Sequence, residues 1–192
     1  MGFGPKHAVL GLDVVGFEPN TLFLFVGFVA AMDNASQLIL GEFSRRLDDR
    51  FRLSIPPDFV EKLKAESGDC VLAKERTGCI SLWSASDWQA KQAARIELLE
   101  SRLKLGDLDR NLGRVQELGR LLSTRHRPVQ LAGRGRLVLP EGFREFLAVD
   151  PGEEVIIVGA NVCIEIWNPP HWSDYVNEKM PDFRALFEEL AV

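Results

Sequence analysis

The chain has 192 residues, 46% of them hydrophobic and 27% charged, and its 23 basic and 28 acidic residues give a formal net charge of −5. This composition excludes a disordered polymer, and the length allows one or two domains with a sizeable core. The acidic balance argues at first sight against nucleic acid as a partner, because proteins that bind DNA usually carry an excess of Lys and Arg.

Residues 1–41 are predicted to form an N-terminal extension outside the folded domains. Their longest apolar run, residues 22–32, has about half of the roughly 20 residues that a membrane-spanning helix needs. Lys6 is the only Lys or Arg before this run, whereas a secretion signal needs a basic start. We therefore expect no membrane partner and no secretion. The three cysteines include no CxxC pair, which fits a reducing cytoplasm without a zinc site or a disulfide framework.

An internal repeat organises the rest of the chain. A shift of 84 residues lays residues 47–88 over residues 131–172 without a gap, with 14 identities in 42 positions. Chance would give about two or three identities at ordinary residue frequencies. We therefore predict two copies of one unit, residues 42–87 and residues 126–171, which are each near the lower size limit for folding alone and should share one core in a pseudo-twofold arrangement.

Each copy shows the same order of predicted elements. Residues 51–56 and 135–140 alternate with period two and predict strands with one buried face. A proline then opens a short predicted helix, at 58–63 and at 142–147. Two further apolar runs follow in each copy and predict hairpins, with turns at 74–77 and 159–161. Each unit is thus predicted to be strand, helix, strand, strand.

Helical periodicity separates the copies and ends the chain. Residues 88–125 predict a linker of two helices that is broken at Gly106, with Ser84 and Asp87 as a start signal. Residues 172–192 predict a C-terminal helix whose start at Trp172 mirrors the start of the linker at Trp88.

Arginines stand out in the first predicted strand of each copy. Arg50 and Arg52, like Arg134 and Arg136, are out of phase with the apolar positions and should point away from the core. Arg45 and Arg46 precede the first pair, and residues 120–136 hold five arginines and no acidic residue. An arginine beside Asp48 can be a solvated surface pair of little energetic value. The competing interpretation is a basic edge or loop that is presented to DNA.

No catalytic constellation accompanies these arginines. We find no nucleophile with a base, no carboxylate pair and no metal cluster at an interpretable spacing. The glycine-rich residues 133–136 precede a predicted strand, whereas a phosphate-binding loop opens a helix. The matched Cys79 and Cys163 fit small core residues. We therefore expect no enzyme activity, no cofactor, no metal and no small-molecule substrate.

Two segments carry a family resemblance. Residues 48–56 read DDRFRLSIP, and residues 132–140 read AGRGRLVLP. With the duplication, the linker and the tryptophans at matched strand ends, they resemble the MraZ family, in which D-x-x-x-R followed by L-S-[IV]-P occurs in each of two tandem SpoVT-AbrB domains. The resemblance covers the chain from about residue 42. It implies an α+β fold, a duplicated swapped-hairpin barrel of the AbrB type with two pseudo-symmetric β-α-β-β halves.

The resemblance also implies a function. Members of this family are transcriptional regulators of the division and cell-wall gene cluster, here expected to act as a repressor, which assemble into rings and bind repeated G-rich promoter elements. The implied partners are double-stranded DNA and further copies of the chain, in the cytoplasm and at the nucleoid. The expected DNA-binding residues, with Arg52 as the strongest candidate, are Arg52, Arg50, Arg136, Arg134, Arg45 and Arg46, and Asp48 is expected to orient the motif.

Three departures from the family pattern matter. Ala132 stands where the family has an aspartate, so that Arg136 lacks an orienting carboxylate. Phe51 stands where the family usually has glycine, which removes backbone freedom from the turn. The 31 residues before Met32 have no counterpart in the family, and we expect either translation from Met32 or a lineage-specific tail. The alternative function is an oligomeric scaffold or protein-interaction module on the same barrel that has lost DNA binding, which Ala132 and the acidic net charge would allow.

Overall fold

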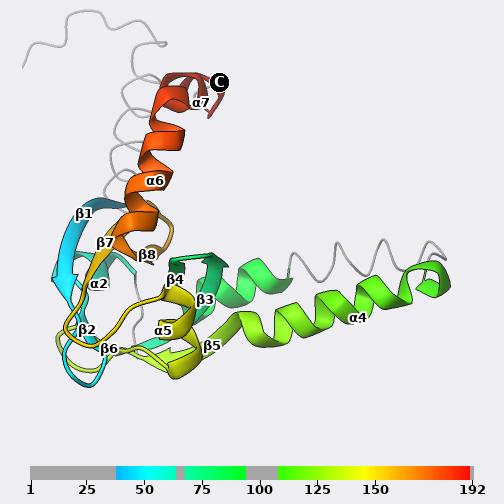
Figure 1. The fold of residues 1–192 in the computed structure, drawn as a ribbon, viewed down its shortest axis with the longest axis horizontal. Coiled ribbons are helices and arrows are strands. Elements are labelled where there is room, and N and C mark those ends of the chain that lie inside the picture. Colours follow the sequence, from blue (N-terminus) through cyan, green and yellow to red (C-terminus); the bar gives the residue numbers. More distant parts are fainter. Residues whose placement is uncertain (1–37, 64–67, 94–107, 191–192) are drawn as a thin grey trace, which may run out of the picture. The chain divides into compact units, whose positions relative to one another are not determined.

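The computed structural model describes residues 38–63, 68–93 and 108–190, and two β-rich segments make up most of it (Figure 1). The first segment contains β1 (Ile39–Arg46), β2 (Arg52–Ser54), α2 (Pro57–Lys62), β3 (Asp69–Arg76) and β4 (Cys79–Ser84). The second contains β5 (His126–Gln130), β6 (Arg136–Val138), α5 (Glu141–Leu147), β7 (Glu154–Asn161) and β8 (Ile164–Trp167). The fold is mixed α+β with antiparallel strands.

Each segment has one strand more than its sequence predicted. β1 and β5 precede the arginine motifs, and β1 already begins at Ile39, ahead of residue 42. The sequence did not predict β5 because it contains Pro128. Proline has no N–H for a strand ladder and usually ends a strand. It is tolerated here because β5 lies at the edge of the sheet. Arg45 and Arg46 are therefore residues of the edge strand β1.

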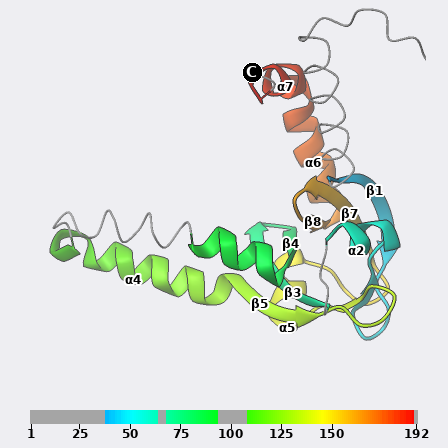
Figure 2. The same cartoon turned by 180° about the vertical axis from the view of Figure 1, so that it is seen from behind.

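The strands of the two segments are interleaved (Figure 2). The six-stranded sheet has the order β1-β7-β8-β4-β3-β5, and β2 pairs with β6 in a separate two-stranded sheet. In the repeat, β1, β3 and β4 correspond to β5, β7 and β8. When each strand of the sheet is replaced by its counterpart, the strand order is the same, read from the opposite edge. Strands thus pair between the segments at β1 with β7, at β4 with β8 and at β3 with β5, as the shared-core prediction requires.

One hydrophobic core lies beneath both segments. Leu53 and Leu137 face each other across β2 and β6 and are completely buried. Phe59 of α2 and Phe143 of α5 belong to the same cluster, because both short helices turn their apolar side towards the sheet. Burial of each such side chain stabilises the fold by about 1.5–3 kcal/mol. Neither segment could gather this core alone, since the cluster takes its side chains from both.

Both long hairpins turn later than predicted. β3 continues through residues 74–76, and the turn is formed by Thr77 and Gly78, whose φ of 74° is left-handed and suits glycine. β7 likewise continues through Asn161, so that its turn lies at residues 162–163 and not at 159–161. The polar residues that suggested turns therefore occupy strand ends.

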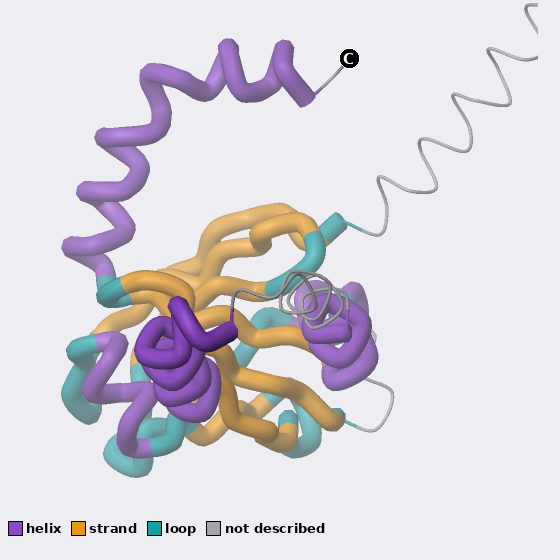
Figure 3. Tube along the Cα trace, turned by 90° about the vertical axis from the view of Figure 1, so that its right-hand side faces the viewer, coloured by secondary structure: helices purple, strands orange, loops and turns teal. Residues whose placement is uncertain are grey.

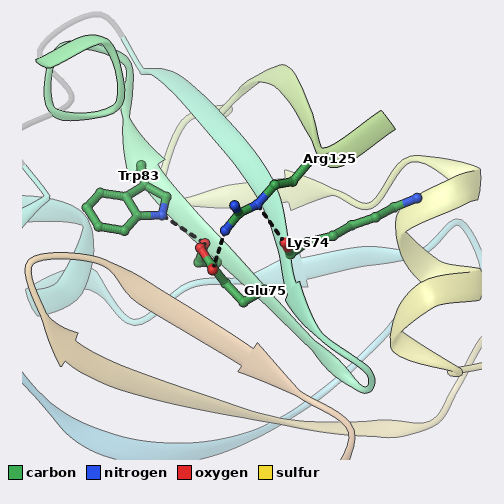
Figure 4. Close-up of polar contacts among 5 residues, drawn as sticks. Lys74, Glu75, Trp83 and Arg125 are labelled. Atoms are coloured by element: carbon green, nitrogen blue, oxygen red, sulfur yellow. Dashed lines mark hydrogen bonds and ion pairs between the residues drawn. The ribbon is translucent and has the colours of Figure 1, made fainter. Parts of the chain in front are cut away.

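A partly buried polar network joins the linker to the sheet. Residues 85–93 are helical, and α4 (Leu108–Arg125) leads directly into β5, whereas the predicted break at Gly106 lies outside the described residues. The guanidinium of Arg125 donates to a Glu75 carboxylate oxygen at 2.8 Å and to the carbonyl of Lys74 at 3.1 Å (Figure 4). The other Glu75 oxygen accepts from Ser81, whose hydroxyl accepts from the indole of Trp83. This network fixes the end of α4 on β3 and β4.

The C-terminal helix is longer and less regular than predicted. α6 (Pro169–Lys179) begins ahead of Trp172, a 3₁₀ turn occupies Met180–Asp182, and α7 (Phe183–Leu190) completes it. Trp172 packs against Trp167 at the end of β8, which anchors the start of α6, and Figure 3 shows α6 and α7 continuing away from the strands. Among the described helices, none is long and apolar enough to cross a membrane.

Candidate nucleic-acid interface

The β2–β6 pair presents one polar face and one apolar face. Arg52 lies opposite Val138, Leu53 opposite Leu137, and Ser54 opposite Arg136. Residues that face each other across an antiparallel pair lie on the same side of it. Because the two leucines are buried, the other two pairs point away from the core. Arg52 and Arg136 therefore lie on one outward face, one from each repeat, in the direction that the sequence predicted.

Asp48 organises the loop before β2. Its carboxylate accepts the backbone N–H of Arg50 and of Arg52, both at 2.8 Å, and lies 3.9 Å from the Arg52 guanidinium. The backbone N–H of Arg52 and, more weakly, that of Arg50 hold the pKa of Asp48 below its ordinary value by stabilising the ionised carboxylate. Arg50 is exposed in this loop, and Arg52 follows it at the first position of the strand. Asp48 thus fixes the backbone from which Arg52 projects.

The loop before β6 closes without a carboxylate. Ala132 and Arg136 exchange two backbone hydrogen bonds, at 2.9 and 3.1 Å, and Gly135 donates to the Ala132 carbonyl at 3.0 Å. Arg134 and Gly135 both have left-handed φ values, 64° and 74°, whereas only Phe51 is left-handed in the first loop. The two loops are therefore related in sequence but differ in backbone conformation at their arginines.

Phe51 and Gly135 are counterparts at the same left-handed position. Phe51 has a φ of 55°, which an aromatic residue rarely adopts. Its ring packs on the guanidinium of Arg144 in α5 at 4.0 Å. On the other side, a Cβ at Gly135 would come within 2.6 Å of Val60 in α2, so only glycine fits there. Each loop thus contacts the helix of the other repeat.

A groove opens beside the second loop. It has a volume of about 440 Å³ and is lined by Ser54, Gly133, Arg134 and Arg136. Arg134 and Arg136 are exposed, and neither forms an ion pair within the part of the chain that the structure describes. Ser54 comes from the first repeat and Arg136 from the second, so pairing of β2 with β6 creates the groove. Ser54 was missed as a candidate, although its position in the motif is out of phase with the core.

The remaining sequence candidates lie elsewhere. Arg45 and Arg46 belong to β1 in the six-stranded sheet. Arg46 pairs with Glu154 at 3.9 Å, in a well-exposed ion pair of small energetic value. Arg45 donates to the neighbouring carbonyl of Ser44. The structure therefore brings together the arginines of the β2 and β6 motifs but does not place Arg45 and Arg46 in the same strand pair.

The basic segment 120–136 is also less available than its sequence suggests. Arg125 forms an ion pair with Glu75, and both side chains are partly buried.

The cysteine thiols stay protonated at neutral pH, because burial raises the pKa of Cys70 to about 11 and that of Cys163 to about 12. Within residues 38–63, 68–93 and 108–190, no group of three or more His, Cys, Asp or Glu side chains is placed to hold a metal ion.

Comparisons with known proteins find a matching family and several sequence relatives. A family model described as "MraZ protein, putative antitoxin-like" matches residues 126–191. The Transcriptional regulator MraZ of Shewanella baltica is 30% identical over 154 residues, which are 79% of this chain and 91% of that protein. Its namesake in Syntrophomonas wolfei is 29% identical over 153 residues, 80% of this chain and 96% of the relative.

Solved structures add little to these matches. The solution structure of PHS018 from Pyrococcus horikoshii aligns with 67% of this chain and 88% of that chain, at 13% identity and a TM-score of 0.28, which is too low to support an argument. The relative from Shewanella baltica, by contrast, is 30% identical and is aligned over 91% of its length. The chain belongs to the MraZ family.

Proposed function

We propose that this chain is a sequence-specific DNA-binding transcriptional regulator that acts as a homo-oligomer and is not an enzyme. The observation that carries the proposal is the outward face of β2 and β6, where each repeat contributes one arginine, Arg52 or Arg136, to a single strand pair. An arginine fork can meet O6 and N7 of guanine together, and each good pair contributes about 1–3 kcal/mol of discrimination. Repeated G-rich promoter elements of the division and cell-wall gene cluster are the targets that the family suggests.

The charge distribution supports this function despite the acidic total. Positive charge without an acidic neighbour in sequence gathers in the Arg134 loop and at Arg136, whereas Asp48 and Asp49 offset Arg50 and Arg52 in the first loop. The acidic surface elsewhere on the protein would keep DNA on the basic face and suppress non-specific adhesion.

We place the protein at the nucleoid in the cytoplasm, as a repressor. The interleaved strands also support a duplicated swapped-hairpin barrel, with domains at 42–87 and 126–171.

An exposed apolar stripe supports self-association. Phe183, Leu186, Phe187 and Leu190 follow a helical spacing on α7 and are each more than half exposed. Exposed apolar stripes of this kind mark protein contacts. A second copy presents the same stripe, so a self-complementary contact is available. An assembly would touch several promoter repeats at once and turn weak single contacts into tight binding by effective concentration.

Gel retardation with the DNA that precedes the chain's own gene tests the proposal. Arg52→Ala should abolish retardation and leave the oligomer intact. Arg114→Ala is the charge-matched control, because Arg114 is an exposed arginine of α4 outside the β2–β6 face. Unchanged retardation by Arg52→Ala would remove Arg52 from the interface. Absence of retardation by the unmodified chain would instead favour an oligomeric scaffold, which the missing carboxylate at Ala132 allows.

A further inference from the structure

We infer that the two repeats contact different parts of DNA. A backbone phosphate binds in the groove lined by Ser54, Gly133, Arg134 and Arg136. Arg52 and Val138 face the edges of the bases. This inference rests on the proposed DNA binding and adds a division of labour to it. It follows from the places where the two loops depart from their repeat symmetry.

The groove has the chemistry of an anion site. Two guanidinium groups and one hydroxyl line it, and its lining contains no carboxylate. The space beside Gly133 is open to a ligand, because a Cβ at that residue would meet no atom within 4 Å. Phosphate oxygens accept hydrogen bonds from arginine, from serine and from backbone N–H groups in protein–DNA complexes. Ala132 matters here because an aspartate at that position would place a negative charge beside Arg136, as Asp48 does beside Arg52.

The environment of Arg52 differs from that of Arg136. Its guanidinium lies 3.9 Å from the Asp48 carboxylate, which would repel a phosphate. Its side chain is 41% exposed, and its backbone N–H is held by the same carboxylate. Directly across the strand pair lies Val138, whose apolar side chain is 54% exposed. A positioned arginine next to an exposed methyl group suits base edges, since arginine reads guanine and apolar groups contact the methyl of thymine.

Lysine substitutions separate the two roles. Lysine keeps the positive charge that a phosphate needs but lacks the planar fork that reads guanine. Affinities of the full-length chain should be measured at several salt concentrations, for a duplex of its own upstream DNA and for a scrambled duplex of the same length and composition. The ratio of the two affinities reports base reading. The slope of log affinity against log salt reports phosphate contacts, at about 0.9 per phosphate on duplex DNA.

The expected results differ between the two repeats. Arg136→Lys should leave both the ratio and the slope near those of the unmodified chain, whereas Arg136→Ala should lower both affinities alike and reduce the slope by about 0.9 for each engaged copy. Ala132→Asp should act in the same direction as Arg136→Ala. Arg52→Lys should keep the slope but reduce the ratio by about 5- to 150-fold for one lost bidentate contact. Val138→Ala should reduce the ratio without changing the slope.

Two outcomes would overturn the inference while leaving the proposed function standing. The first is a loss of the affinity ratio in Arg136→Lys as large as that in Arg52→Lys, which would make both arginines readers of bases. The second is an unchanged salt slope in Arg136→Ala, which would mean that the groove holds no phosphate. Failure of the proposed function would look different, because the unmodified chain would then bind neither duplex or both equally.

Discussion

The guanidinium carbon of Arg144 lies 4.0 Å from the centre of the Phe51 ring, so that the loop of the first repeat rests on a helix of the second. Phe51 is left-handed with a φ of 55°, a conformation that costs about 1–3 kcal/mol for a residue other than glycine. The contact offsets part of this cost, since a cation over an aromatic face contributes about 0.5–1 kcal/mol at a partly exposed site. The departure from the family's glycine is thus tied to a partner in the other repeat.

Substitutions of Phe51 should separate strain from packing. Phe51→Ala removes the ring and keeps the strained φ, so the free energy of unfolding should fall by about 1–2 kcal/mol. Phe51→Gly also removes the ring but relieves the strain, and it should be more stable than Phe51→Ala by about 1 kcal/mol. Urea unfolding of the three proteins measures both differences. Equal stabilities of the alanine and glycine variants would show that position 51 is not strained.

Acid should release the loop at Asp48 only below the ordinary pKa of an aspartate, about 3.9. The backbone N–H groups of Arg52 and Arg50 lower the pKa of Asp48 in the folded protein, so the unfolded chain takes up the proton first as the pH falls. The contribution of Asp48 to the free energy of unfolding is therefore complete above about pH 4 and is lost as the pH falls through the lower, folded pKa.

NMR titration of the Asp48 carboxyl measures this pKa directly, and the amide signals of Arg50 and Arg52 should shift with the same midpoint. Asp48→Asn serves as the control, because it should remove this part of the pH dependence of unfolding. A carboxyl that titrates at or above its ordinary pKa would contradict the hydrogen bonding of the loop.

Much of this architecture could be predicted from the repeat. The alternation of apolar and polar residues predicted that Leu53 and Leu137 are buried and that Arg52 and Arg136 point outward. Successive side chains of a strand point to opposite faces, so burial of one set exposes the other. The matched tryptophans likewise predicted packing, and Trp167 packs against Trp172 in the structure. Local pattern sufficed wherever burial decided the outcome.

Long-range pairing could not be predicted in the same way. β5 carries Pro128 and reads as a loop until its position at a sheet edge is known. Arg125 reads as part of a basic surface until folding brings Glu75 to it across 50 residues of chain. The groove beside Arg136 depends on Ser54 of the other repeat. Each of these features is created by contacts between distant segments and has no local signature.

The pair of Arg125 and Glu75 should stabilise the junction of linker and sheet without taking part in DNA binding. Its side chains are only 28% and 19% exposed, so removing one partner leaves a charge in a poorly solvated place. Glu75→Gln and Arg125→Met should each lower the free energy of unfolding by about 1–3 kcal/mol. The double variant should recover part of that loss, and a double-mutant cycle measures the coupling.

DNA binding provides the contrast for the same pair. Arg125→Met should leave the salt slope of DNA affinity unchanged, although Arg125 lies in the basic segment 120–136. A slope that falls as much as in Arg136→Ala would place Arg125 on the DNA instead. Additive losses of stability in the double-mutant cycle would show that the two charges do not act together.

The apolar stripe of α7 should decide the oligomeric state. Phe187 is 64% exposed, and its ring centre lies 6.3 Å from that of Phe183. Phe187→Glu places a charge in the middle of the stripe, and a charge that loses water without a partner is costly at a protein contact. Arg184→Ala is the control, because Arg184 lies on the same helix but is exposed away from the stripe and pairs with Glu188. Sedimentation should show a smaller particle for Phe187→Glu and an unchanged one for Arg184→Ala.

Because α7 lies outside the β2–β6 face, Phe187→Glu should retain weak binding to a single promoter element and lose the gain in affinity that several elements give. A particle of unchanged mass would exclude α7 as the contact between copies.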